Sequence, residues 1–219
     1  MIDYRAVKSV IPHMNPRVTS RVRLAPPAHL AAVDPVMRRL VRRIQLPRLP
    51  KRTNSFHTLV ETIVSQQLSG RVAQVIFGRI VKAARVRTLT PTAVEKLDDA
   101  QLRTCGLSRA KLKYIRDLAQ KVRDKQLPFR RFRHMTDDEI IASLTQVKGI
   151  GRWSAEMHLI FVLHRPDVFS GGDLGIRTAL AKHYGITDHK IDLNAFAERW
   201  KPYRTTACLY LWRSLSDEE

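Results

Sequence analysis

Cysteine is scarce in this chain: only Cys105 and Cys208 occur among its 219 residues. Two distant thiols cannot form a disulfide framework, a thiolate zinc site or a four-cysteine iron–sulfur cluster, so we expect both to be buried and free. The eight histidines show no metal-ligand spacing, and we expect His158 and His164 to have hydrogen-bonded roles in or beside the core. The sequence also lacks a GK[ST] phosphate loop, a GxGxxG nucleotide fingerprint and a serine nucleophile elbow.

Long apolar runs are missing as well. The best run, LIFVL at residues 159–163, is far shorter than the roughly 20 residues that span a bilayer. The first residues, MIDYRAVKSVIPHMNPR, do not contain the apolar segment of a signal peptide. The sequence therefore predicts a soluble intracellular protein that is not secreted.

Acidic residues are too few to balance the basic ones. Lys and Arg number 39 and Asp and Glu number 20, so the formal net charge is 39 − 20 = +19. The basic residues are spread along the chain instead of gathered in a tail, and no lipidation motif occurs at either end. This distribution favours nucleic acid over a membrane surface as the partner.

What the sequence does contain is helical periodicity. Apolar residues recur at helical spacing in residues 55–68 and again in residues 71–81, where the expected buried stripe is Val72, Val75, Ile76 and Ile80. Cap signals precede several such segments: Asp34, Asp98, Ser108, Thr136 with Glu139, and Asp173. No period-two run or strand–helix–strand pattern is present. We therefore predict an all-α fold.

The segment VKGIGRWSAEM, residues 147–157, joins two predicted helices through Gly149 and Gly151. Glycines allow several backbone amides to converge on one point, and such a nest binds a phosphate. The following helix adds its N-terminal dipole, and Lys148 and Arg152 add full charges. The alternative is a tight structural turn without a ligand; the net charge favours the anion site.

Four segments, in this order, carry a resemblance to a known family: IVSQQLSGRVA, GLSRAKLKYIRDLA, LTQVKGIGRWSAEMHLIFVLHRPDVFSGGDLGIR and ERWKPYRTTACLYLWR. Together they resemble the helix-hairpin-helix DNA glycosylase superfamily, in particular the alkylbase group called 3-methyladenine DNA glycosylase II. The resemblance covers Phe56 to Trp212. It implies two helical lobes with a cleft between them: residues 55–165 with the hairpin, and residues 1–54 plus 166–219.

The resemblance also implies that Asp173, in FSGGDLGIR, is the catalytic aspartate. Cleavage of an N-glycosidic bond develops positive charge on the sugar, and a fixed carboxylate stabilises that charge and orients water. The alternative is an ordinary helix cap, which stabilises a helix by about 1 kcal/mol.

The implied base pocket consists of Trp153, Met157 and Trp212. Trp153 stands where bifunctional relatives carry the lysine that forms a Schiff base, so the resemblance implies a monofunctional enzyme without lyase activity. An aromatic ring at this position favours cationic methylated purines through stacking and cation–π attraction. Taken alone, residues such as Met157 and Trp212 on a helix stripe are more often plain core residues.

The remaining implied residues contact DNA. Gln67 matches the plug that fills the space left by a flipped base, with Leu68 as a second wedge residue; taken alone, a solvated glutamine at a helix end is the expected alternative. The residues implied to hold the phosphate backbone are Lys148, Gly149, Gly151, Arg152, Arg109 and Lys111. Ordinary exposed charge is the alternative for Arg109 and Lys111. The carbonyls of Thr145, Val147 and Ile150 would hold a structural Na⁺ or K⁺ at the hairpin.

These residues together predict a monomeric, monofunctional glycosylase that excises alkylated purines from double-stranded DNA in base excision repair. The lesions are 3-methyladenine first, then 7-methylguanine and related adducts, and no cofactor is required. The expected location is the nucleoid of a prokaryote or the nucleus of a eukaryote. Two alternatives stay open: a non-catalytic protein of the same fold that binds abasic or damaged DNA, and a general basic nucleoid or RNA-binding protein.

Overall fold

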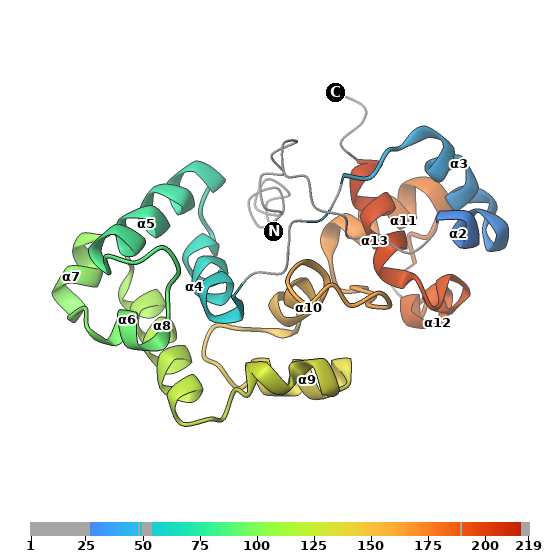
Figure 1. Cartoon of the computed structure of the whole chain (residues 1–219). Coiled ribbons are helices and arrows are strands. Elements are labelled where there is room, and N and C mark those ends of the chain that lie inside the picture. Colours follow the sequence, from blue (N-terminus) through green and yellow to red (C-terminus); the bar gives the residue numbers. More distant parts are fainter. Residues whose placement is uncertain (1–26, 48, 50–53, 189, 216–219) are drawn as a thin grey trace. The chain divides into compact units, whose positions relative to one another are not determined.

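The computed structural model describes residues 27–47, 49, 54–188 and 190–215. The N-terminal segment examined for a signal peptide lies outside them. Every regular element in the described residues is helical, as the sequence predicts (Figure 1). None of these helices is both long and apolar enough to cross a membrane. Both cysteines are free and buried, as expected.

The described residues form two compact units, which divide inside one helix, after His158. Unit 1 comprises residues 54–158, and unit 2 comprises the described residues up to 49 together with those from 159 onward. The boundary expected at residue 165 lies just beyond this helix.

Unit 1 contains α4 (Ser55–Ser65), α5 (Gly70–Ala83), α6 (Pro91–Glu95), α7 (Asp99–Thr104), α8 (Arg109–Arg123), the 3-10 helix η1 (Phe129–His134), α9 (Asp137–Leu144) and the first part of α10 (Arg152–Phe161). Helix α8 packs against α4, α6 and α7. The predicted capping box is present at Thr136 with Glu139, and Ser108 caps α8 as predicted. Asp98 caps α7 and forms a second capping box with Gln101. Local side-chain chemistry therefore fixes where these helices begin.

The predicted apolar stripe of α5 is wrong in part. Val72 and Val75 are 46% and 48% exposed, whereas Ala73 and Ile80 are buried. Ile76 and the neighbouring Phe77 are half-buried between them, so the buried stripe has the spacing i, i+3/i+4 and i+7. Helix α5 packs on α4 through this narrow stripe. The small side chain of Ala73 occupies the place that the pattern assigned to a valine.

Unit 2 contains α2 (Pro27–Val33), α3 (Pro35–Arg43), the end of α10, α11 (Leu174–Tyr184), α12 (Leu193–Ala197), the 3-10 helix η2 (Glu198–Trp200) and α13 (Arg204–Arg213). Asp34 joins several of them. Its Oδ1 accepts the amides of Val36 and Met37, and its Oδ2 accepts the Trp200 indole N–H and the Tyr184 hydroxyl. The buried carboxylate is thus satisfied on both oxygens, as burial of a charge requires.

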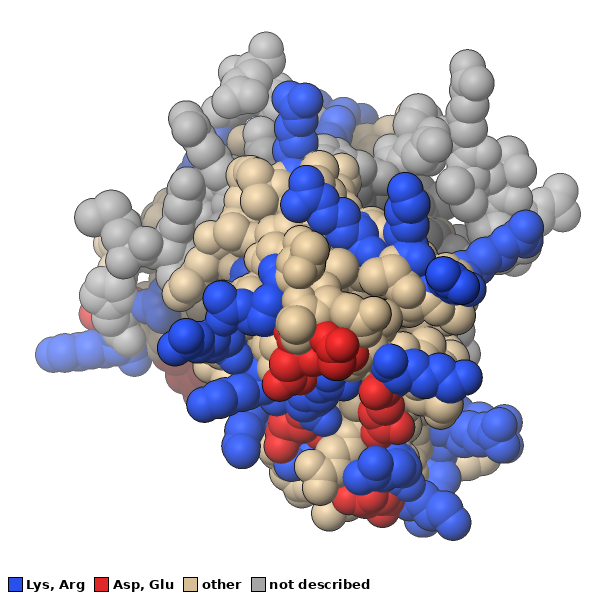
Figure 2. All heavy atoms as spheres, turned by 90° about the vertical axis from the view of Figure 1, so that its left-hand side faces the viewer, with Lys and Arg blue, Asp and Glu red and all other residues tan. Residues whose placement is uncertain are grey.

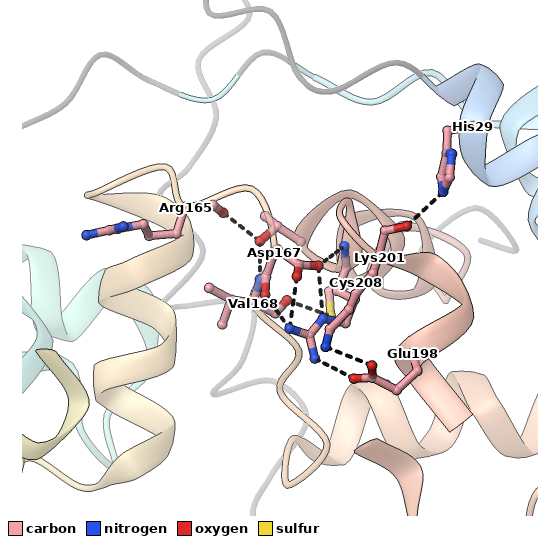
Figure 3. Close-up of polar contacts among 9 residues, drawn as sticks. His29, Arg165, Asp167, Val168, Glu198, Lys201 and Cys208 are labelled. Atoms are coloured by element: carbon pink, nitrogen blue, oxygen red, sulfur yellow. Dashed lines mark hydrogen bonds and ion pairs between the residues drawn. The ribbon is translucent and has the colours of Figure 1, made fainter. Parts of the chain in front are cut away.

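The connection between α10 and α11 is fastened to the start of α13 (Figure 3). The Arg204 guanidinium pairs with Asp167 through two hydrogen bonds, Nε to Oδ1 at 2.9 Å and Nη2 to Oδ2 at 3.0 Å. The Thr205 hydroxyl donates to the Arg165 carbonyl at 2.6 Å and accepts the Val168 amide at 3.0 Å. A bidentate pair of this kind fixes the relative orientation of the two side chains in addition to pairing their charges. The segment that leads to Asp173 is therefore held in place.

His158 is a core residue of unit 1, in agreement with the sequence analysis. Its Nε2 lies 3.1 Å from the Ser55 hydroxyl, and its side chain is buried. Burial lowers the pKa of His158 to about 3, because the charged imidazolium loses its hydration.

The depressed pKa predicts a pH dependence of folding. Between pH 6.5 and about 3 the unfolded chain binds a proton at His158 that the folded chain excludes, so stability falls as the pH falls through this window. The His158 contribution should approach about 1.4 kcal/mol per pH unit. Urea unfolding of the parent and of His158→Gln, compared at pH 7 and pH 5, measures it, and the variant should lose less stability on acidification. Equal losses in both proteins would contradict the neutral, buried state of His158.

Candidate functional site

The turn between α9 and α10 uses its two glycines differently. Gly149 has a φ of 81°, and a Cβ added there would overlap the ring of Tyr114 on α8. Gly151 has no positive φ, and a Cβ added there would meet nothing within 4 Å. Gly149 is thus required by the fold, whereas Gly151 leaves an open approach to the start of α10.

Hydrogen bonds within the turn leave two amides available. The Val147 amide donates to the Leu144 carbonyl at 3.1 Å, and the Ile150 amide donates to the Val147 carbonyl at 3.0 Å. Among the described residues, the amides of Gly149 and Gly151 have no hydrogen-bond partner. Free amides beside a helix N-terminus are suited to binding an anion such as a phosphate oxygen.

A third amide of the turn is already used. The Lys148 amide donates to Asp117 Oδ2 on α8 at 2.9 Å, and the Lys121 ammonium donates to Asp117 Oδ1 at 2.9 Å. Burial opposes ionisation of this carboxyl, but these two donors outweigh it and the pKa of Asp117 is lowered. Sequence reasoning missed Asp117, because only the fold brings it to the turn.

The charged residues expected around the turn are exposed. Lys148 and Arg109 are exposed, and the Arg152 side chain is 68% exposed although its Nε donates to Glu156 at 2.9 Å. Figure 2 shows Lys and Arg side chains spread over one face, with a smaller group of Asp and Glu among them. The charge is therefore distributed over the surface and not confined to the hairpin.

The predicted wedge residues follow α4. Gln67 is exposed and has a φ of 56°, a backbone conformation that is uncommon outside glycine, and Leu68 is half-buried. The preceding side chain, Gln66, donates from Nε2 to the Gly149 carbonyl at 2.7 Å. The structure therefore brings the predicted wedge and the hairpin turn together within unit 1. Gln66 was missed because its partner lies far away in the sequence.

The Lys111 ammonium binds the end of a neighbouring helix within unit 1. Its Nζ donates to the carbonyls of Val64 and Gln66, each at 2.7 Å. These two bonds direct the ammonium to the C-terminal carbonyls of α4, and a grip on a DNA phosphate stays a prediction for Lys111. Burial also lowers the pKa of Lys111.

Trp153 and Met157 both lie on α10, one turn apart. Trp153 is half-buried in the first turn, and Met157 is buried. The burial of Met157 agrees with the alternative of a core residue, while Trp153 is only half-buried.

Asp173 and Trp212 meet inside unit 2. Asp173 is only 2% exposed, and its Oδ1 accepts the Ile176 amide and the Trp212 indole N–H, both at 2.8 Å. Trp212 is buried and stacks on Phe161 with ring centroids 5.8 Å apart. A Cβ at Gly175 would come within 3.1 Å of both Asp173 and Trp212, so glycine makes room for their contact. Asp173 does cap α11, and the cap also orients a buried carboxylate.

Comparison with known proteins decides the family. The family described as "HhH-GPD superfamily base excision DNA repair protein" matches residues 60–204. The chain belongs to this superfamily. Its matched region contains Gln67, the hairpin and Asp173, but ends before Trp212.

Relatives within the superfamily match most of the chain. DNA-3-methyladenine glycosylase 1 of Schizosaccharomyces pombe is 31% identical over 193 residues, which are 85% of each chain. A crystal structure of DNA-3-methyladenine glycosidase from Bacillus halodurans has a TM-score of 0.81 and 34% identity, and covers 89% of this chain and 92% of that one. The structure of S. pombe Mag1 in complex with abasic DNA has a TM-score of 0.74 and 29% identity, and covers 87% and 96%.

The different roles of the two hairpin glycines predict different effects of alanine. Gly149→Ala should lower the free energy of unfolding by at least about 1–2 kcal/mol, because alanine resists the positive φ and its methyl group meets Tyr114. Gly151→Ala should leave stability unchanged but weaken binding to duplex DNA, because the methyl group obstructs the approach to the free amides. Urea unfolding and fluorescence anisotropy measure the two effects. Equal stability of the Gly149→Ala protein and the parent would refute the steric argument.

The contact between Trp212 and Asp173 predicts an energetic coupling. Trp212→Phe keeps a ring against Phe161 but removes one donor from a buried carboxylate, so unfolding should become easier by about 1.5–3 kcal/mol. In an Asp173→Ala protein, Trp212→Phe should lower the free energy of unfolding by much less. A double-mutant cycle from urea unfolding measures the coupling, and additive effects would show that the hydrogen bond does not matter.

Proposed function

We propose that this chain is a monofunctional DNA glycosylase that excises alkylated purines and leaves an abasic site. The observation that carries the proposal is the buried Asp173 carboxylate, held by Trp212 at the start of α11 in a member of a base excision repair superfamily. The names of the S. pombe and B. halodurans relatives support 3-methyladenine as the first substrate. The range is proposed to extend to 7-methylguanine and related adducts.

The chemistry needs one fixed negative charge and one water molecule. The bond between sugar C1′ and the base nitrogen breaks, and its electron pair leaves with the base. A purine that alkylation has made cationic then departs as a neutral molecule. Asp173 stabilises the positive charge on the sugar and orients the water, whose oxygen bonds to C1′ and which releases one proton. No cofactor enters these steps.

The base must first leave the duplex. In the proposed mechanism the Gly149 and Gly151 amides, with Lys148, Arg152 and Arg109, hold the backbone, while Gln67 and Leu68 fill the vacated stack. The half-buried Trp153 offers a ring for the extruded cationic base. Because position 153 holds tryptophan and not the lysine that forms a Schiff base, we propose no lyase activity.

A structural cation at the hairpin remains a separate proposal. Groups of three or more His, Cys, Asp or Glu that could hold a metal ion are absent from the described residues. A Na⁺ or K⁺ would instead be held by the carbonyls of Thr145, Val147 and Ile150, although the Val147 carbonyl already accepts the Ile150 amide. We further propose that the protein acts as a monomer on double-stranded DNA.

Asp173→Asn tests the proposal, because asparagine caps a helix about as well as aspartate but carries no charge. Release of 3-methyladenine from methylated duplex DNA should fall by a factor on the order of a hundred or more. Affinity for an abasic-site duplex should stay near that of the parent. Asp192, which caps α12 in the same way, supplies the matched control: Asp192→Asn should excise like the parent.

The outcomes separate the candidate functions. Equal release by the parent and Asp173→Asn would reject the catalytic role of Asp173. If neither releases any alkylated base but both bind an abasic-site duplex tightly, the chain is a damaged-DNA binding protein. Binding without any lesion preference would indicate a general nucleic-acid binding protein.

A further inference from the structure

One face of α8 supports both the predicted wedge and the hairpin. Lys111, Tyr114 and Asp117 are three residues apart, so they lie along one side of the helix. Tyr114 lies against Gly149, and Asp117 accepts the Lys148 amide. Lys111, at the N-terminal end of this row, binds the end of α4.

The Lys111 contact holds a helix terminus. The last carbonyls of an α-helix lack partners within the helix and carry the negative end of its dipole. The Lys111 ammonium satisfies two carbonyls here, those of Val64 and Gln66, each at 2.7 Å. A charged donor at this place stabilises the last turn of α4 in one conformation.

The next residue has a backbone conformation that needs support. Gln67 has a φ of 56°, and a non-glycine residue keeps such a conformation only where its surroundings impose it. Gln66 supplies contacts on one side: its carbonyl is bound by Lys111, and its side-chain amide donates to the Gly149 carbonyl at 2.7 Å. On the other side, the Leu68 amide donates to the Ser65 carbonyl at 3.2 Å.

We propose that Lys111 and Gln66 are positioning residues that act as a latch, fixing the direction in which Gln67 leaves α4 relative to the hairpin turn. The inference rests on the proposed function in one respect, namely that Gln67 is the wedge. The latch keeps the wedge and the phosphate-binding amides at a set separation, so that gripping the backbone at the turn places Gln67 at the vacated stack. Neither latch residue needs to contact DNA.

A phosphate-binding role and a latch role for Lys111 predict different salt dependences. Loss of a phosphate contact lowers affinity for every duplex and reduces the slope of log affinity against log salt by about 1. Loss of the latch leaves the phosphate contacts in place, so the salt slope is unchanged and only the preference for a duplex with a vacant stack position decreases.

The experiment compares binding to an abasic-site duplex and to the same duplex without a lesion, over a salt series. The variants are Lys111→Met, which keeps an unbranched side chain one atom shorter and removes the ammonium, and Gln66→Met, whose partly exposed position tolerates the change. Lys113→Met is the matched control, because it removes one charge from an exposed position on the same helix. Lys111→Met should reduce the preference for the abasic duplex about tenfold, the factor that corresponds to one hydrogen bond to a charged group. Gln66→Met, which removes a neutral hydrogen bond, should reduce it by a smaller factor, about two- to tenfold. Lys113→Met should not change the preference.

A second comparison tests whether the latch acts through the wedge. If it does, Lys111→Met should cause no further loss of preference in a Gln67→Ala protein, because the residue that it positions is already gone. Additive losses, or an altered salt slope in Lys111→Met, would overturn the latch.

If the assignment of the wedge or of the glycosylase activity is wrong, the parent protein itself gives a different result. A parent protein without any preference for the abasic duplex would overturn the wedge, and the latch with it. A parent that prefers the abasic duplex but excises no base would refute only the glycosylase, and the latch comparisons would still support or overturn the latch.

Discussion

Close packing of the Gly149 backbone against the Tyr114 ring is the constraint on which the arrangement of unit 1 depends. A side chain at position 149 would push the turn away from α8, and the Lys148 amide would then lose Asp117. The Gly149 carbonyl would also move away from Gln66, whose backbone carries Gln67. One position without a side chain therefore allows the hairpin turn and the predicted wedge to share a single support, the face of α8.

In unit 2, helix α13 supports both the connection after α10 and the Asp173 carboxylate. Arg204 and Thr205, at the start of α13, hold the connection that follows α10, and Trp212, two turns later, holds the Asp173 carboxylate at the end of that connection. Burying a carboxylate is costly unless donors replace its hydration, and the Ile176 amide and the Trp212 indole supply two of them. The same donors limit the directions in which the carboxylate can point, as an electrostatic role in catalysis requires.

Structural features that depend on residues close together in the sequence can be predicted from the sequence. The caps at Asp34, Asp98, Ser108, Thr136 and Asp173 were all foreseeable, because a cap binds amides two or three residues away. The exposure of Val72 and Val75 could not be predicted, because the periodicity does not show which side of α5 packs against α4. The contacts of Lys111 could not be predicted for a related reason: a lysine in a basic chain is expected at the surface, and its partners lie 45 and 47 residues away. Predictions of the wedge, the base pocket and the catalytic carboxylate rest on family resemblance.

Net charge and local geometry contribute differently to recognition. A charge of +19 attracts any polyanion and does not select one site on it. At the hairpin itself, the Arg152 guanidinium is already paired with Glu156, and the Lys148 backbone amide donates to Asp117. In the proposed mechanism, the amides of Gly149 and Gly151 are the hairpin donors with a fixed direction, beside the charged side chains of Lys148 and Arg152. In that mechanism the broad positive charge attracts nucleic acid, and the fixed amides determine where a phosphate binds, because an amide donates along one direction whereas a mobile ammonium does not.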